Sequence, residues 1–210
     1  MTKLLRISED SIARAAEAVR GGGLVVYPTD TVYGLGCDPF NERAVNRLAN
    51  VKQRKKGNLP VLVSSLEKAK LIGSFKDILD LPITRFWPGP LTIVVPCKLS
   101  LPLQVIGQDR MIGLRIPGRN DTLDLISRSG GFLVGTSANI SGMSPLRNAE
   151  DAPAMFKGKV DVVLDGGSVS TRVESTVVKQ TDYGIQLLRE GAIKYGEFEA
   201  ALPSKLKAKA

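Results

Sequence analysis

Short runs of apolar residues, each bounded by glycine, proline or polar residues, constrain the fold of this chain most. Leu24–Tyr27, Val61–Val63 and Phe132–Gly135 are apolar at successive positions rather than at alternate ones. A strand of this composition is buried on both faces and needs other elements on both sides. Helical spacing of apolar residues between the runs, as in Ser11–Arg20, supplies those elements. The pattern therefore predicts an α/β fold in which helices cover a sheet.

The rest of the chain continues this alternation. Gly21–Gly23 ends the first helix, and Asn41 and Asp121 are suited to cap later ones. Further strands are predicted at Leu91–Val95, Met111–Ile116, Val160–Leu164, Thr176–Val178 and Ile185–Leu188. Further helices are predicted after Asn41, at Leu66–Ile72, Asp77–Phe86, Thr122–Arg128 and Ala149–Phe156, and from Lys194 onward. We expect one domain over residues 1–198 and a short basic tail over residues 199–210.

Composition excludes several kinds of site. The chain has 210 residues and no histidine, so it cannot hold a Ser-His-Asp triad or an HExxH metal site. Two cysteines are too few for a disulfide framework or a four-thiolate zinc site. The Walker A pattern and the GxGxxG fingerprint are both absent. A bound polyphosphate must therefore be held by side chains and isolated backbone turns.

The formal net charge of +8 favours anionic partners such as nucleotides, carboxylates or RNA. Six basic residues and one acid lie between Glu42 and Pro60, and taken by itself this run favours a solvated helix face over a binding surface. No apolar run approaches the roughly 20 residues that span a bilayer. The N-terminus lacks an apolar core of signal-peptide length. We expect an intracellular, cytoplasmic protein without a membrane partner.

Polar residues at strand and helix ends are the candidate functional groups. Thr29, Asp30 and Thr31 follow a buried strand, where they either face a site or bond their own backbone in a turn. Lys52 ends a helix, where a cation also favours the helix dipole. Arg115 interrupts an apolar strand, and such a charge must be paired or face a cleft. We favour the cleft for Arg115.

Seven such segments together resemble the YrdC/Sua5 family, the threonylcarbamoyl-adenylate synthases of tRNA modification. They occur in the family's order and extend over nearly the whole chain up to about residue 198. The segments are YPTDTVYGLGCD at Tyr27–Asp38, KxR at Lys52 and Arg54, WPGPLT at Trp87–Thr92, LRIP at Leu114–Pro117, TSAN at Thr136–Asn139, ESTVV at Glu174–Val178 and LLREG at Leu187–Gly191.

The resemblance implies a twisted mixed sheet of about seven strands, flanked by helices around a concave positive cleft. It also implies a nucleotidyltransferase that converts L-threonine, bicarbonate and ATP into threonylcarbamoyl-AMP, pyrophosphate and water. A separate transferase then moves the threonylcarbamoyl group to adenosine 37 of certain tRNAs. Magnesium is expected to accompany the ATP rather than to occupy a protein metal site. Direct binding of tRNA or double-stranded RNA is a further expectation.

The resemblance assigns roles residue by residue. Lys52 and Arg54 are the expected catalytic residues, because they stabilise negative charge on the reacting phosphate. The implied ATP ligands are Lys52, Arg54, Asn58, Met111, Ser137, Asn139, Pro145 and Arg189. The implied threonine ligands are Thr31, Ser64, Arg115, Gly135 and Ser175. Arg115 suits the carboxylate of threonine, because its planar fork can bond both oxygens.

Two features qualify the resemblance. Ser64 stands where many family members have histidine, and the stretch from Arg54 to Pro60 is one residue longer than in close relatives. An alternative function is a non-catalytic RNA-binding module of the same fold, which the basic Arg43–Lys56 stretch would serve. Both the KxR and the SxN residues are present here, and aromatic residues for base stacking make up only 5% of the chain, so the enzyme is favoured.

Overall fold

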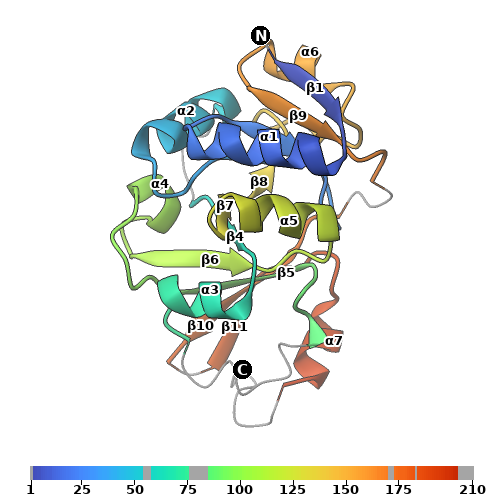
Figure 1. Cartoon of the computed structure of the whole chain (residues 1–210). Helices are drawn as coiled ribbons and strands as arrows, with labels where there is room; N and C mark the ends of the chain where they lie inside the picture. The colour runs from blue at the N-terminus through green and yellow to red at the C-terminus, as the bar shows by residue number, and fades with distance from the viewer. Residues whose placement is uncertain (1, 54–57, 76–84, 170–172, 183, 203–210) are drawn as a thin grey trace.

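Two mixed β-sheets form the framework of the fold. The computed structural model describes residues 2–53, 58–75, 85–169, 173–182 and 184–202. One sheet, sheet A, has the strand order β1-β9-β2-β3-β8 and lies in the upper part of Figure 1. Its strands are β1 (Lys3–Arg6), β9 (Val162–Asp165), β2 (Val25–Tyr27), β3 (Gly34–Gly36) and β8 (Thr136–Ser137). β9 pairs in parallel with β1 and β2, and the other neighbours are antiparallel.

The second sheet, sheet B, has the order β11-β10-β5-β6-β4-β7 and lies in the lower part of Figure 1. Two parallel pairs, β10 with β5 and β4 with β6, alternate with three antiparallel pairs. The strands are β4 (Val61–Val63), β5 (Leu91–Pro96), β6 (Met111–Arg115), β7 (Phe132–Val134), β10 (Thr176–Thr181) and β11 (Gly184–Arg189).

Gly135 joins the two sheets. It lies between β7, an edge of sheet B, and β8, an edge of sheet A. A Cβ atom at this position would lie 2.4 Å from the Cγ of Leu62, a distance that no side chain tolerates. Glycine therefore allows the chain to cross between the sheets in direct contact with β4. The single predicted strand Phe132–Gly135 is in fact the end of one sheet and the start of the passage to the other.

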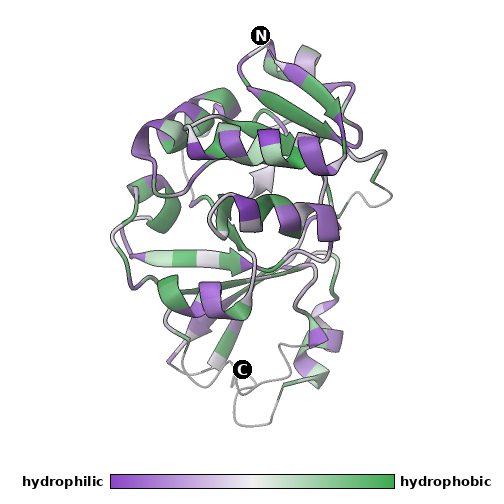
Figure 2. Cartoon of the chain, in the orientation of Figure 1, coloured by the Kyte–Doolittle hydropathy of each residue, from purple (hydrophilic) through white to green (hydrophobic). Residues whose placement is uncertain are grey.

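Helices cover both sheets, and their apolar sides form the core. α1 (Glu9–Arg20) packs against α5 (Asn120–Arg128), and Figure 2 shows both with alternating hydrophilic and hydrophobic bands. Ser8 and Ser11 form a reciprocal capping box, which starts α1 two residues before the predicted helix. The side chain of Asn41 caps α2 (Glu42–Lys52), as predicted. The remaining helices are α3 (Leu66–Ile72), α4 (Leu103–Ile106), α6 (Ala152–Phe156) and α7 (Tyr195–Ala200).

The predicted mixed α/β architecture is confirmed, but the strands are divided between two sheets rather than one. The strands β1, β3 and β8 and the helix α4 were not predicted, because two to four residues carry too little periodicity. The predicted Asp121 cap is wrong. Arg119 holds the cap position without a side-chain cap, and the Asp121 carboxylate accepts instead from the Nε of Arg119, 2.8 Å away.

The chain end and the helix predicted at Asp77–Phe86 are described only in part. Residues 76–84 of that predicted helix, and residues 203–210 of the predicted tail, lie outside the described residues. Phe198 and Leu202 are buried in the core, so the chain packs onto the fold as far as residue 202. No helix within the described part of the chain is long and apolar enough to cross a membrane.

Candidate functional site

A cavity of about 540 Å³ opens where the two sheets meet. Nine of the thirteen predicted site residues line it, although they come from segments scattered between residues 31 and 189. Strand alternation explains much of this. In β6, Ile112 and Leu114 point into the core, whereas Gly113 and Arg115 line the cavity. The nine are Thr31, Lys52, Asn58, Arg115, Gly135, Ser137, Asn139, Ser175 and Arg189.

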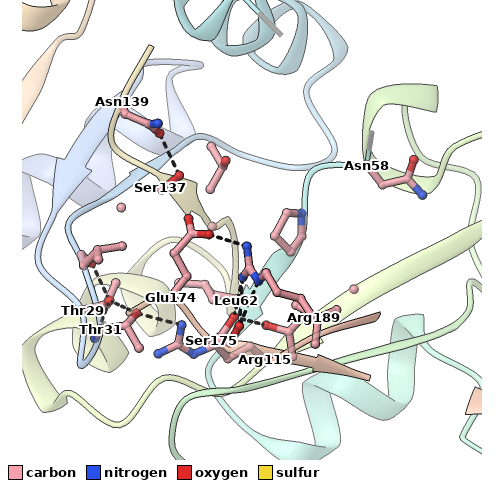
Figure 3. Close-up of a pocket in the computed structure, with 18 of the residues that line it drawn as sticks. Thr29, Thr31, Asn58, Leu62, Arg115, Ser137, Asn139, Glu174, Ser175 and Arg189 are labelled. Carbon is pink, nitrogen blue, oxygen red and sulfur yellow. Dashed lines mark hydrogen bonds and ion pairs between the residues drawn. The ribbon is translucent and has the colours of Figure 1, made fainter. Parts of the chain in front are cut away.

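Arg115 and Thr31 form one end of the cavity, which we call the arginine end (Figure 3). Asp30 pairs with Arg115. Arg115 is buried, and three neighbours hold its guanidinium. Nε donates to the carbonyl of Gly89 at 2.9 Å, and Nη1 donates to Oγ1 of Thr31 at 3.2 Å. Nη2 donates to Oδ1 of Asp30 at 2.5 Å. Burial lowers the pKa of Arg115, while the charge of Asp30 raises it.

The hydroxyl groups of Thr29 and Thr31 form a chain with a defined direction. Thr29 donates its only hydroxyl proton to the carbonyl of Val32 at 2.6 Å. Thr31 must therefore donate in the 3.0 Å contact between the two hydroxyls. Oγ1 of Thr31 also accepts from Arg115, which leaves it one lone pair. Thr29 thus bonds the backbone of its own turn, as in the alternative that the sequence left open. Oγ1 of Thr31 is at the same time an acceptor in the cavity lining.

Lys52, Ser137 and Asn139 form a second group, which we call the lysine end. Lys52 is the last residue of α2 and is 3% exposed. Its Nζ donates to the carbonyls of Ser137 and Asn139, at 2.5 and 3.1 Å, and to Oδ1 of Asn139 at 2.8 Å. Ser137 also donates to that Oδ1 at 2.8 Å. The oxygens in these three contacts of Lys52 are neutral.

A second arginine lines the same cavity. Nη1 of Arg189 forms an ion pair with Glu174, and Nη2 donates to the carbonyl of Ser175 at 3.0 Å (Figure 3). The hydroxyl of Ser175 also lies 2.9 Å from that of Thr92. Glu174 and Thr92 were not predicted as site residues. Alternation along β5 could have found Thr92, because its neighbours Leu91 and Ile93 face the core.

Four predicted site residues are not among those that line the cavity. Arg54 lies outside the described residues. Ser64 directly follows β4, and its N–H donates to the carbonyl of Gly131 at 3.2 Å. The carbonyl of Met111 accepts from the side chain of Asn58 at 3.2 Å, and Pro145 is half-buried outside the lining set. Contacts of these four with a ligand stay predictions.

Burial keeps nearby acidic groups neutral. Tyr27 is fully buried, which raises the pKa of its phenol far above the usual value. Its hydroxyl donates to the carbonyl of Val134 at 2.9 Å. Burial also raises the pKa of the Cys37 thiol to about 12. Neither group supplies a base near neutral pH. The polar groups that line the cavity are the cations of Lys52, Arg115 and Arg189, several hydroxyls and amides, and the carboxylate of Glu174.

Comparison with known proteins identifies the family of the chain. The family model Sua5/YciO/YrdC, described as "Telomere recombination", matches residues 17–191. The chain belongs to this family. A curated threonylcarbamoyl-AMP synthase of Pyrococcus abyssi is 36% identical over 199 residues, which cover 94% of this chain and 58% of that protein. The chain therefore spans less than two thirds of that relative's length.

A shorter relative and a solved structure extend the comparison. The threonylcarbamoyl-AMP synthase of Aliivibrio fischeri is 32% identical over 186 residues, which cover 86% of this chain and 99% of that protein. The crystal structure of P. abyssi Sua5 complexed with L-threonine superposes with a TM-score of 0.91. That match has 33% identity and covers 99% of this chain and 62% of the other.

Proposed function

We propose that this chain is an L-threonylcarbamoyladenylate synthase. It converts L-threonine, bicarbonate and ATP into threonylcarbamoyl-AMP, pyrophosphate and water. The observation that carries the proposal is that the arginine end and the lysine end line one cavity. The names of the P. abyssi and A. fischeri relatives, and the threonine complex of the former, support the same activity.

The arginine end suits the amino acid. The guanidinium of Arg115 is fixed at three nitrogens and can present its outer N–H groups to the carboxylate of threonine. The remaining acceptor site on Thr31 suits the ammonium or hydroxyl group. Ser175 and Gly135 line the same cavity, as the proposed threonine ligands should.

The lysine end suits the nucleotide. Lys52 offers a buried positive charge, and Ser137 and Asn139 offer a hydroxyl and an amide beside it. In this proposal these groups exchange some of their present contacts for phosphate oxygens, and Arg189 and Asn58 approach the nucleotide from other parts of the lining. Arg54, two residues after Lys52, is proposed to add a second cation. Such donors stabilise the charge that spreads over the α-phosphate during attack.

The mechanism is then one of positioning. The neutral amine of threonine attacks the bicarbonate carbon, a C–O bond breaks, and the oxygen leaves as water with the proton from nitrogen to give a carbamate. A carbamate oxygen then attacks the α-phosphorus, and the bond to pyrophosphate breaks. These steps bring several anions together, so their mutual repulsion is the main barrier that the cations reduce. A histidine is not required for this role, which accords with its absence from the chain.

Magnesium is proposed to enter with ATP. Glu174 is the one carboxylate among the described residues that line the cavity, and it forms an ion pair with Arg189. Within the described part of the chain, no cluster of three or more His, Cys, Asp or Glu side chains forms a metal site. This donor set fits an ion that phosphates and water hold, with at most one protein carboxylate. Such an ion would neutralise phosphate charge.

Further partners follow from the proposed product. The threonylcarbamoyl group would pass to a downstream transferase and then to tRNA, so we place the protein in the cytoplasm. The positive charge of the chain is compatible with direct binding of tRNA or double-stranded RNA. Lys55 and Lys56, which would contribute to such a surface, lie outside the described residues.

A ligand-omission assay with mass detection tests the proposal. Purified protein is incubated with ATP and magnesium, and L-threonine and bicarbonate are each left out in turn. We expect threonylcarbamoyl-AMP and pyrophosphate only in the complete mixture. Pyrophosphate release that does not depend on threonine would overturn the substrate assignment. RNA binding without any adenylate would favour the non-catalytic alternative.

A further inference from the structure

Asp30 contacts the arginine end from outside the cavity. Its carboxylate pairs with Nη2 of Arg115, and the two side chains are only 17% and 7% exposed. Arg115 lines the cavity, whereas Asp30 is not among its described lining residues. A ligand in the cavity would therefore meet the guanidinium, with the carboxylate behind it. Such a close, nearly dry pair has no net charge.

The pairing also limits the donors that Arg115 can offer. A guanidinium carries five N–H groups, and three of them donate to Gly89, Thr31 and Asp30. One N–H remains on each of Nη1 and Nη2. Two donors on neighbouring nitrogens match the two oxygens of one carboxylate. The same two donors can bind two oxygens of a phosphate, so the charge of Asp30, rather than the number of donors, must distinguish the two ligands.

Thr31 adds the complementary feature. Because its proton is directed to Thr29, its remaining capacity toward a ligand is that of an acceptor. An ammonium group donates to such an oxygen, whereas a phosphate oxygen does not. The arginine end therefore offers a ligand two N–H donors on Arg115 and one acceptor on the neighbouring Thr31.

The neighbouring arginine is balanced in the same way. Arg189 lines the same cavity as Arg115, and it forms an ion pair with Glu174. Two arginines and two carboxylates thus occupy this part of the site, and their formal charges cancel. A dianion gains little from a region without net charge, while a zwitterion still gains from the separate partners.

We propose that Asp30 determines which ligand the arginine end accepts. By neutralising Arg115, Asp30 makes this end select a zwitterionic amino acid and reject phosphate groups. Asp30 is then a specificity-determining residue that acts through Arg115. This inference rests on the proposed function, because it assumes that L-threonine binds beside Arg115. It explains how a cavity that must hold both an amino acid and a polyphosphate keeps them apart.

Asp30→Asn tests the proposal, because asparagine keeps an oxygen for Nη2 and removes only the charge. L-threonine is titrated calorimetrically into the protein without ATP, at rising concentrations of inorganic phosphate. We expect phosphate to compete with threonine about tenfold more strongly in the variant than in the wild type. This is the effect of one unit charge a few ångströms from the ligand in a partly screened site. An unchanged competition would overturn the proposal.

Two further variants serve as controls. Asp121→Asn breaks an ion pair with Arg119 of similar exposure, 20% for Asp121, but neither partner lines the cavity. It should leave the phosphate competition as in the wild type. Asp30→Glu keeps the charge and should also keep the wild-type preference. If either control raises phosphate affinity as much as Asp30→Asn does, the effect is not due to the charge at Asp30.

A second probe needs only the wild-type protein and covers the case in which Asp30→Asn does not fold. 3-Hydroxybutyrate has the carboxylate and hydroxyl of threonine but no ammonium group. The wild type should bind it at least tenfold more weakly than L-threonine, because the charge-balanced end favours the zwitterion. Equal binding of the two would overturn the role of Asp30. If the wild type binds no L-threonine at all, the proposed function itself fails.

Discussion

The two ends of the cavity hold cations in different ways. At the arginine end, Arg115 is fixed by a carboxylate, a hydroxyl and a carbonyl, and its charge is balanced by Asp30. At the lysine end, Nζ of Lys52 donates to two carbonyls and an amide oxygen, all of them neutral. A balanced, rigid fork suits a carboxylate, whereas a buried charge among neutral oxygens suits phosphate. The surroundings of each cation, rather than its charge alone, distinguish the ligands.

The two ends also rest on different parts of the fold. Arg115 is the last residue of β6, a strand in the interior of sheet B, and it pairs with Leu62 of β4. Lys52 ends α2, where Gln53 has a left-handed backbone conformation with φ of 53°. Helix and strand ends are where a side chain can leave regular packing and reach a site. Substitutions at the arginine end should therefore affect mainly L-threonine, and substitutions at the lysine end mainly ATP.

The largest effect is expected for Lys52→Ala. Loss of the buried cation should lower kcat/KM for ATP about 100-fold, equivalent to about 3 kcal/mol of transition-state stabilisation. The affinity for L-threonine should change little. Arg47→Ala is a matched control, because Arg47 lies on the same helix and pairs with Asp161 at the surface. Steady-state kinetics with each substrate varied in turn provide the measurement.

Arg115→Lys should weaken the binding of L-threonine and leave ATP binding nearly unchanged, the opposite of what we expect for Lys52→Ala. Lysine keeps the charge but cannot make the fixed contacts with Gly89, Thr31 and Asp30, nor present a bidentate fork. We expect L-threonine to bind roughly 30-fold more weakly, within the range for charge-assisted hydrogen bonds. Calorimetry should show ATP binding within about twofold of the wild type. Equal losses for both ligands would mean that the ends are not separate.

Thr31→Val should have a smaller effect at the same end. Valine removes the acceptor that Arg115 and the ligand share, and it keeps nearly the same shape. We expect about a tenfold rise in KM for threonine, the cost of one buried hydrogen-bonding group. Thr31→Ser restores the hydroxyl and should restore most of the affinity. A Thr31→Ser variant as weak as Thr31→Val would point to packing instead.

The smallest effect is expected for Glu174→Gln. The side chains of Arg189 and Glu174 are 44% and 34% exposed, so solvent screens their ion pair. The free energy of unfolding should fall by less than about 1 kcal/mol. KM for ATP should change less than about threefold. A loss of activity as large as that of Lys52→Ala would instead place Glu174 in the reaction itself.

The sequence predicted the mixed α/β class and nine residues that line the cavity, but not how the strands divide between two sheets. Arg115 was predictable because a charge in an apolar strand needs a cleft or a partner, and here it has both. Ser64 lies two residues after Leu62, which lines the cavity, so regular strand alternation would point both side chains to the same face. β4 ends at Val63, however, and Ser64 is not among the residues that line the cavity. The division into two sheets was not predictable, because it depends on strands such as β8 that have only two residues. The pairing of Asp30 with Arg115 is a long-range contact, which no local pattern specifies.

A crystal structure with L-threonine and a non-hydrolysable ATP analogue tests the account most directly. The central claim is that each end of the cavity takes a different ligand. We expect the threonine carboxylate about 3 Å from the guanidinium of Arg115, and the phosphate groups beside Lys52, Ser137 and Asn139. Phosphate bound to Arg115, or the threonine carboxylate bound to Lys52, would contradict the account.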